Sequence, residues 1–201
     1  MDPDKFMDIA MQGEVLKNLP RMGWILAGFD RSLVETVAAH SFGTALISLL
    51  LAKQLICSGS EIDIGRTLTM AVIHDLAEAR TSDIVVYKGD SADTAVLNSK
   101  RETENRVMAD ILKPLGLIGK DLEEVWTSLR DKSSIESRLV AAADILDMLI
   151  HAISMEQSGA APTLLAGFFD SSRNRLSALD MQIALDLYDE LLRMHNAELS
   201  R

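Results

Sequence analysis

Apolar residues recur along most of the chain at the three-to-four-residue spacing of amphipathic helices. Ser32 and Glu35 have the spacing of a capping box, which marks a helix start. Only residues 84–87 have the β-branched character of a short strand. The pattern therefore predicts an all-α protein with helices over residues 5–19, 32–57, 64–79, 92–112, 121–129, 134–157 and 177–199.

The segments between these predicted helices contain proline, glycine and serine. One of them, residues 80–90, is expected to be a loop that directly follows the third helix. Residues 159–167 are expected to separate the last two helices. At 201 residues the chain suits a single domain, 1–201, with a core over about 32–158 and the N- and C-terminal helices packed on it.

Charge and composition restrict the partners. The formal net charge is −10, only 4% of the residues are aromatic, and no run of five Lys or Arg occurs. These features argue against nucleic acid or an anionic membrane as a partner. A small phosphorylated ligand is still compatible with them, because a bound metal with one or two Arg or Lys side chains reverses the local field.

Cysteine content and the apolar stretches indicate a compartment. Cys57 is the single cysteine, so no intrachain disulfide forms and a reducing environment is expected. The apolar stretch 45–52 contains Ser48 and ends at Lys53, which is too short for a membrane span. The N-terminus lacks a basic segment followed by an apolar core. We expect a soluble, cytoplasmic protein.

His74 and Asp75 stand side by side within the apolar stretch 69–78. An unpaired carboxylate is costly to bury in such surroundings, so a compensating partner is expected. A divalent metal meets this need, because imidazole nitrogen and carboxylate oxygen are both ligands for transition ions.

Further candidate ligands lie on two other predicted helices. His40 follows small and apolar residues, and Asp144 interrupts the apolar stretch 139–150. A lone histidine on an apolar face is more often a hydrogen-bonded core residue, and the His-Asp pair elsewhere weakens that interpretation. Asp147 and His151 share the helical face of Asp144, so the sequence does not make Asp144 the unique ligand.

The remaining histidine, His195, lies in a polar helical turn near the end of the chain and is expected to be solvated. His40, His74, Asp75 and Asp144 would together supply two imidazoles and two carboxylates from three helices. Such a set leaves coordination positions open, as catalytic metal sites do, whereas a structural zinc site fills its positions and here would use cysteine. A metal in such a site activates water and polarises a phosphoryl oxygen.

These residues occur in an ordered pattern that resembles the HD-domain phosphohydrolases, and most closely the small HD-domain 5′-deoxynucleotidases. The resemblance spans most of the chain. Its carriers are Leu19-Pro20-Arg21-Met22-Gly23-Trp24, Val34-Glu35-Thr36-Val37-Ala38-Ala39-His40-Ser41, His74-Asp75-Leu76-Ala77-Glu78 with Ser82-Asp83, and Ala143-Asp144-Ile145-Leu146-Asp147-Met148.

The resemblance implies an all-helical fold with the metal site between helices, and a homodimer. It implies one divalent transition metal, Mn, Co, Zn, Ni or Fe, held by His40, His74, Asp75 and Asp144. The implied reaction is hydrolysis of nucleoside 5′-monophosphates, with a preference for deoxyribose.

Four further residues carry over from the family pattern. Glu78, four positions after His74, would be the general base or acid beside the metal. Asp83 would be a second catalytic residue that faces the sugar, Arg21 would bind the phosphate, and Trp24 would limit the sugar pocket. The ordinary alternatives are a solvated glutamate, a loop-capping aspartate, a surface arginine and a core tryptophan. Lys88, Lys100 and Arg101 could also reach a phosphate, although a solvated face is the more common role.

The chain also departs from the family pattern. The family often has Gly before the loop aspartate and Pro soon after it, where this chain has Ser82 and residues 84–86. The family commonly has Lys after the last metal aspartate, where this chain has Ile145. The expected ligands are unchanged, so these departures affect substrate choice more than reaction class.

The expected activity is removal of the 5′-phosphate from a (deoxy)nucleoside monophosphate by metal-activated water. One alternative is an HD hydrolase of another phosphorylated nucleotide, such as a triphosphate or an alarmone. Another is a non-catalytic, metal-stabilised dimer module that senses nucleotides.

Overall fold

The computed structural model describes residues 2–85 and 94–200. Lys88 and part of the predicted strand-like stretch 84–87 lie outside these residues. The elements are α1 (Pro3–Leu16), α2 (Met22–Leu26), η1 (Arg31–Leu33), α3 (Val37–Cys57), α4 (Ile64–Ile73), α5 (Glu78–Thr81), α6 (Thr94–Leu112), η3 (Lys113–Leu115), α7 (Leu117–Asp131), α8 (Ile135–Gln157), α9 (Pro162–Ser177) and α10 (Gln182–Leu199).

The fold is all-α, as the sequence predicts. Within residues 2–85 and 94–200 the only β-type pairing is an isolated bridge between Pro20 and Thr36. Two backbone hydrogen bonds close this bridge, from Arg21 N to Glu35 O at 3.0 Å and from Val37 N to Leu19 O at 2.8 Å. The bridge therefore ties the chain before α2 to the chain before α3.

Backbone contacts divide the chain into two units. The first unit contains Met1–Ala39 and Val72–Thr127, and the second contains His40–Ala71 and Ser128–Arg201. The prediction of one domain with a core over 32–158 is not tested by this division, and it stays a prediction.

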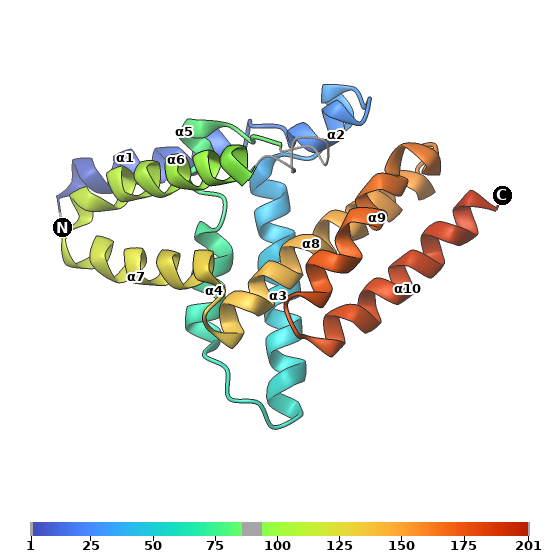
Figure 1. Cartoon of the computed structure of the whole chain (residues 1–201). Helices are drawn as coiled ribbons and strands as arrows, with labels where there is room; N and C mark the ends of the chain where they lie inside the picture. The colour runs from blue at the N-terminus through green and yellow to red at the C-terminus, as the bar shows by residue number, and fades with distance from the viewer. Residues whose placement is uncertain (1, 86–93, 201) are drawn as a thin grey trace. The chain divides into compact units, whose positions relative to one another are not determined.

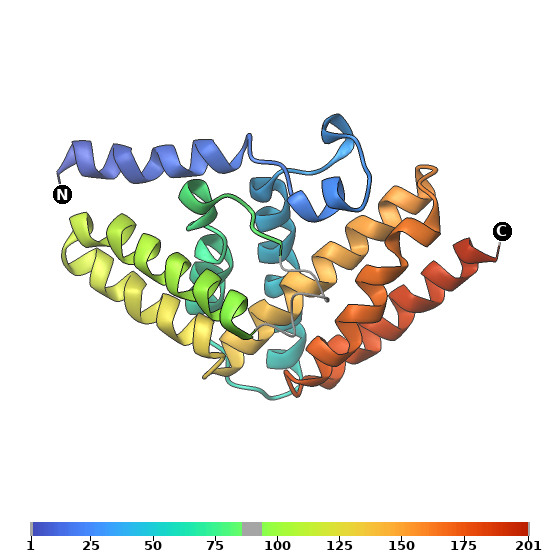
Figure 2. The same ribbon diagram turned by 45° about the horizontal axis from the view of Figure 1, so that its top comes forward.

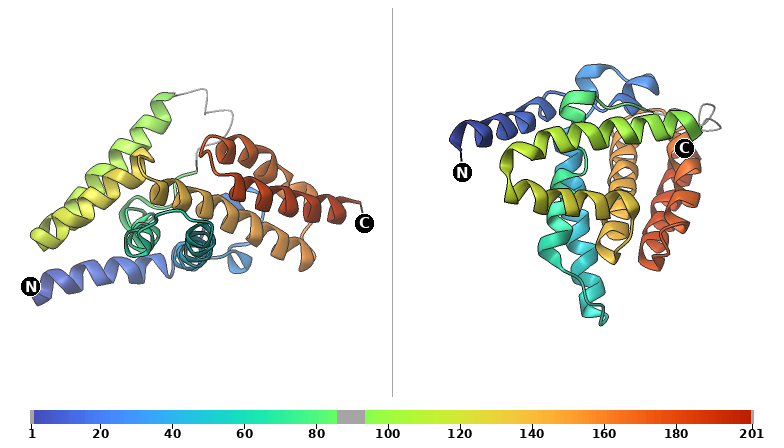
Figure 3. Two further views of the ribbon diagram at one scale, coloured as in Figure 1. Left: turned by 90° about the horizontal axis from the view of Figure 1, so that it is seen from below. Right: turned by 60° about the vertical axis from the view of Figure 1, so that its left-hand side comes forward.

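In the first unit, α5 contacts both α1 and α6. Helices α6 and α7 run side by side, joined through η3, in every view (Figures 1, 2 and 3). The indole Nε1 of Trp126 on α7 donates a hydrogen bond to Asn105 Oδ1 on α6 at 2.9 Å. Met108 and Ile111 of α6 are completely buried or nearly so, which indicates a packed apolar core under this helix pair.

In the second unit, α8, α9 and α10 pack against one another and run side by side (Figures 1 and 2). Leu146 of α8, Phe169 of α9 and Ala184 of α10 are among the buried apolar residues of this layer. The N-terminus of α8 has a capping box formed by Ser134 and Ser137, so the predicted start at residue 134 is confirmed.

The predicted helices differ from the structure at three places. Residues 32–36 are not part of α3, because Asp30 accepts hydrogen bonds from Ser32 N and Oγ and Thr36 accepts one from Ala39 N. The third predicted helix ends at Ile73, because the backbone N–H groups that follow bond to the carbonyl three residues earlier and not four residues earlier. A helix over residues 162–177 was also missed.

Helix α3 is long and apolar enough to cross a membrane when judged by length and composition alone. A helix that packs into a protein core or interface has the same composition. Its exposed apolar residues Phe42, Leu46 and Leu50 follow one another at four-residue spacing, so they lie on one face of the helix.

Candidate functional site

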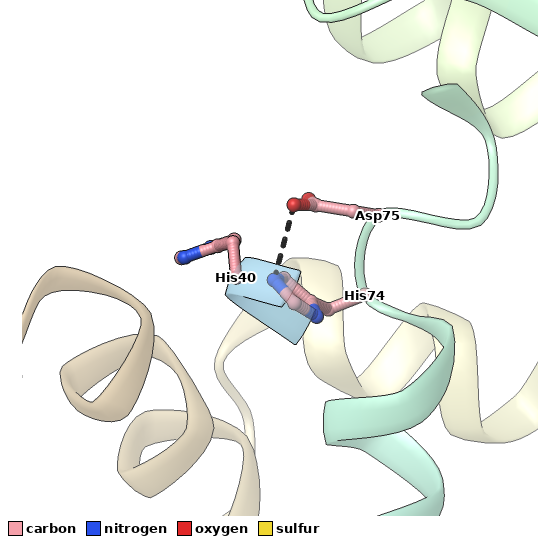
Figure 4. Close-up of side chains that lie close together, drawn as sticks. All are labelled: His40, His74 and Asp75. Atoms are coloured by element: carbon pink, nitrogen blue, oxygen red, sulfur yellow. Dashed lines mark ion pairs between the residues drawn. The ribbon is translucent and has the colours of Figure 1, made fainter. Parts of the chain in front are cut away.

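The His-Asp pair lies in a turn of the first unit, just past the end of α4. The bond from Leu76 N to Ile73 O and the bond from Glu78 N to Asp75 O span three residues each. His74 Nε2 lies 3.2 Å from Asp75 Oδ2, and both side chains are largely buried (Figure 4). The pair is therefore presented by a turn and not by the predicted continuous helix.

Arg21 lies beside this pair. Its Nη1 atom donates a hydrogen bond to Asp75 Oδ2 at 3.2 Å, and its Nε atom lies 3.9 Å from Asp83 Oδ2. The backbone N–H of Met22 donates to the same Asp83 oxygen at 2.8 Å. Asp83 thus fixes the start of α2, as a loop-capping aspartate does. The same carboxylate also orients the guanidinium of Arg21.

Trp24 is a core residue of the first unit. It is 2% exposed, and its indole Nε1 donates to Glu35 Oε1 at 3.1 Å. This matches the ordinary alternative of an anchoring tryptophan. The expected role of Trp24 at the sugar stays a prediction.

Glu78 begins α5 and is buried. Burial raises the pKa of its carboxyl to about 9, and the nearby Asp75 and Asp83 carboxylates add to the increase. Arg21 and Lys100 act in the opposite direction but do not cancel it. In the absence of a cation, the Glu78 carboxyl therefore keeps its proton near neutral pH.

Lys100 of α6 contacts the loop and not an open surface. Its Nζ donates to Ile84 O at 2.6 Å and lies 3.5 Å from Glu104 Oε1. Ile84 has no strand pairing among the described residues. Lys100 therefore holds residue 84 against α6 and places a positive charge on the Glu78 side of the unit.

His40 and two carboxylates of α8 come together in the second unit. His40 is completely buried, and its Nε2 lies 3.1 Å from Asp144 Oδ1. Its Nδ1 lies 2.8 Å from Asp147 Oδ2, a contact that the sequence could not assign. Thr44 Oγ1 lies 3.5 Å from His40 Nε2.

The predicted ligand set is thus distributed over both units. His74 and Asp75 belong to the first unit, and His40 and Asp144 belong to the second. His74 and Asp75 in the first unit, and His40 and Asp144 in the second, offer imidazole nitrogen and carboxylate oxygen atoms of the kind that bind a metal ion. In the second unit the His40 imidazole lies beside the carboxylates of Asp144 and Asp147, and this set of nitrogen and oxygen atoms fits a divalent metal.

His195 is not solvated. It is 2% exposed, its Nδ1 lies 2.5 Å from Glu156 Oε1, and its ring stacks on Phe169 with 4.2 Å between the centroids. The prediction failed because the α10 face that carries Ala184, Tyr188 and His195 packs inward. Its partner lies 39 residues away, which helical spacing cannot reveal.

Known proteins share the fold and the sequence pattern. A Dictyostelium discoideum protein named 5′-deoxynucleotidase HDDC2 is 29% identical over 166 residues, which are 80% of this chain and 84% of that protein. The structure of a conserved hypothetical protein from Pyrococcus furiosus is 32% identical, has a TM-score of 0.77, and matches over 93% of this chain and 99% of its own.

A Listeria innocua HD-domain phosphohydrolase shares the fold with a TM-score of 0.76 at 16% identity, and covers 97% of this chain and 92% of its own. The sequence profile of the HD domain matches residues 13–179, which is most of the chain. The chain therefore belongs to the HD domain family.

Proposed function

We propose that this protein is a metal-dependent phosphohydrolase that removes the 5′-phosphate from (deoxy)nucleoside monophosphates. The observation that carries the proposal is the cluster around Asp75 in the first unit. A guanidinium, a candidate metal ligand and the buried Glu78 carboxyl lie together there. The names of the curated relatives, 5′-deoxynucleotidases at 23–29% identity, support the same reaction.

The proposed ligands are His40, His74, Asp75 and Asp144. Support comes from the contact between His40 and Asp144 in one unit and the contact between His74 and Asp75 in the other. A divalent metal held by such residues supplies Lewis-acid activation of the phosphoryl group and of water. We propose Mn, Co, Zn, Ni or Fe, because mixed nitrogen and oxygen ligands accept each of these ions.

The chain's own residues have distinct tasks in this reaction. Arg21 binds two phosphate oxygens through its planar fork, and Asp83 keeps its guanidinium in place. Glu78 donates its proton to the leaving 5′-oxygen as the bond from phosphorus to that oxygen breaks. The oxygen of a water molecule forms the new bond to phosphorus, one of its protons returns to the Glu78 carboxylate, and the other stays on the phosphate. The products are nucleoside and inorganic phosphate.

The test is phosphate release from a panel of ribo- and deoxyribonucleoside 5′-monophosphates, with and without chelator. We expect release that chelator abolishes and that the added metal restores. Glu78→Gln should lose turnover while it keeps metal content and fold. Release of pyrophosphate or triphosphate from larger nucleotides, without activity on any monophosphate, would contradict the proposed substrate.

We further propose that the protein is a cytoplasmic homodimer. The exposed apolar face of α3 supports this, because Phe42, Leu46 and Leu50 are 72%, 46% and 60% exposed. Burial of such a face against a second copy removes apolar area from water. Leu46→Glu should lower the mass measured by light scattering to that of one chain, whereas Lys53→Glu, on the same helix, should leave it unchanged.

A further inference from the structure

Lys100 of α6 fixes the chain immediately after Asp83, within the first unit. Its Nζ atom donates a hydrogen bond to the backbone carbonyl of Ile84 at 2.6 Å. The Asp83 side chain, one residue earlier, is 8% exposed and accepts a hydrogen bond from the Met22 N–H at 2.8 Å. Asp83 is therefore held at two points, through its own carboxylate and through the carbonyl of the next residue.

Ser82, on the other side of Asp83, has a strained backbone. Its φ of 64° and ψ of 167° favour glycine, and its N–H donates to Glu78 O at 2.9 Å. A strained conformation persists only where the surrounding contacts determine it. The bond to Glu78 supplies such a contact before Asp83, and the bond from Lys100 to Ile84 supplies one after it. Lys100 therefore helps to hold the strained turn that places the Asp83 carboxylate.

Glu104 is a counterion for Lys100. The two residues lie one turn apart on α6, with 3.5 Å between Lys100 Nζ and Glu104 Oε1. Their side chains are 25% and 6% exposed, so solvent screens this pair less than it screens a surface ion pair. Lysine four residues before glutamate is the less favourable order for a helix on its own. The contact with Ile84 therefore explains this pair better than stabilisation of α6 does.

The Asp83 carboxylate connects this arrangement to Arg21. Asp83 Oδ2 lies 3.9 Å from Arg21 Nε, and Arg21 Nη1 donates to Asp75 Oδ2 at 3.2 Å. A guanidinium binds two phosphate oxygens at once through its planar fork, so its orientation matters as well as its charge. A displaced Asp83 carboxylate would therefore leave Arg21 poorly oriented for a phosphate.

We propose that Lys100 is a positioning residue for Arg21. It acts through the carbonyl of Ile84 and the carboxylate of Asp83. In this role the Nζ atom stays on Ile84 O and beside Glu104, and Lys100 does not bind the phosphate itself. The inference rests on the proposed function, in which Arg21 binds the phosphate.

The first measurement is hydrogen–deuterium exchange at single backbone amides by ¹H–¹⁵N NMR, on metal-free protein without substrate. Lys100→Met removes the donor to Ile84, so the Met22 N–H should exchange about 10-fold faster than in the wild type. Asp83→Ala, which removes the acceptor of the Met22 N–H, should show at least this increase. The amide of Met108, a buried residue of α6, corrects for any change in overall stability.

Matched variants separate the contact from the charge of the helix. Lys100→Arg keeps a charged donor and should restore most of the protection of the Met22 amide. Arg106→Met removes the same charge at an exposed position of α6 and should leave Met22 exchange as in the wild type. If Lys100→Met does not fold, Lys100→Gln replaces it with the same expectation, because its amide ends one bond short of the Nζ position.

The second measurement is steady-state kinetics on the monophosphate that the wild type prefers. Lys100→Met should raise KM about 10-fold with little change in kcat, because a misplaced Arg21 weakens phosphate binding. A role in folding alone would lower the active fraction, and therefore kcat, without changing KM. When Asp83→Ala is already present, Lys100→Met should change neither Met22 exchange nor KM further, because Lys100 acts through Asp83.

Unchanged Met22 exchange in Lys100→Met would overturn the proposal, and a raised KM in that case would mean that Lys100 binds the phosphate directly. A loss confined to kcat would also overturn it, and would indicate that the charge of Lys100 acts on the Glu78 carboxyl instead. Failure of the wild type to hydrolyse any monophosphate would contradict the proposed function. The hold of Lys100 on Asp83 would still be decided, because amide exchange is read without substrate.

Discussion

The guanidinium of Arg21 donates to Asp75 at 3.2 Å, so the expected phosphate-binding residue contacts an expected metal ligand directly. The two side chains are 17% and 15% exposed, so solvent screens this pair less than it screens a surface ion pair. If Arg21 binds the substrate phosphate and Asp75 binds the metal, as we propose, this contact couples the two binding events.

Replacement of Arg21 is expected to weaken substrate binding in particular. A charge-assisted hydrogen bond contributes about 1.5–3 kcal/mol, so Arg21→Ala should lower kcat/KM roughly 10- to 100-fold. Arg21→Lys should keep only part of the wild-type kcat/KM, because an ammonium group lacks the planar fork of the guanidinium. Steady-state kinetics on the preferred monophosphate measure both variants. Arg31→Ala, in η1, is the control, and an equal loss there would contradict the assignment.

Glu78 should make the metal-free protein less stable as the pH rises. The pKa of its carboxyl is raised from 4.5 to about 9 in the folded state. Between these values the folded chain binds a proton that the unfolded chain releases, so the contribution of Glu78 to stability is highest below about pH 4.5 and falls up to about pH 9. The side chain in Glu78→Gln does not titrate, so this variant does not lose stability through residue 78 as the pH rises.

Thermal melts in excess EDTA test this dependence. The Tm of Glu78→Gln minus that of the wild type should increase from about pH 5 to about pH 9. Asp110→Asn, on α6, should show no such trend. A Tm difference that stays constant across this pH range would show that Glu78 ionises normally.

Ser82 has a backbone conformation that favours glycine. Its φ is 64° and its ψ is 167°, immediately before Asp83. A residue with a Cβ atom is strained there by about 1–3 kcal/mol, so Ser82→Gly should increase the free energy of unfolding by about 1 kcal/mol or more. Chemical denaturation measures the change. Ser82→Ala keeps the Cβ atom and should gain nothing, and equal stabilisation by both would contradict the backbone explanation.

His195 and Glu156 should stabilise the second unit without a role in turnover. Removal of one partner of a buried pair typically costs about 3–5 kcal/mol, so His195→Ala should lower the midpoint of urea unfolding strongly. Asn196→Ala, at the exposed neighbouring position, should have little effect. At a temperature where His195→Ala is folded, its kcat should equal that of the wild type. A selective loss of kcat would assign this pair to the reaction.

The spacing of apolar residues was sufficient to predict most helices. It did not predict where they end, and it missed one whole helix. Residues 159–167 were predicted to separate two helices, although Pro162 occupies the first turn of α9, where its missing N–H costs nothing. The turn after Ile73 has the same apolar composition as the helix before it. Only the backbone hydrogen bonds, which span three residues in the turn, distinguish the turn from the helix.

The predicted metal ligands stay a prediction, and the sequence revealed only some of their contacts. Asp75 was expected to need a compensating partner, and Arg21 is one such partner. The contact between His40 and Asp147 spans 107 residues, so one sequence cannot distinguish Asp147 from Asp144 or His151 on the same helix face. Gly43 was the remaining signal, because an unexplained glycine inside a helix indicates a close neighbour, which here is the Asp147 carboxylate.

The bridge between Pro20 and Thr36 holds the two ends of the loop 21–35 together. Arg21 and Glu35 lie at these paired ends, and the Glu35 carboxylate accepts the hydrogen bond from the Trp24 indole. The tip, which includes the 71% exposed Leu33, can change in sequence or length without moving them. Changes at the tip are therefore expected to leave Arg21, the proposed phosphate-binding residue, in place.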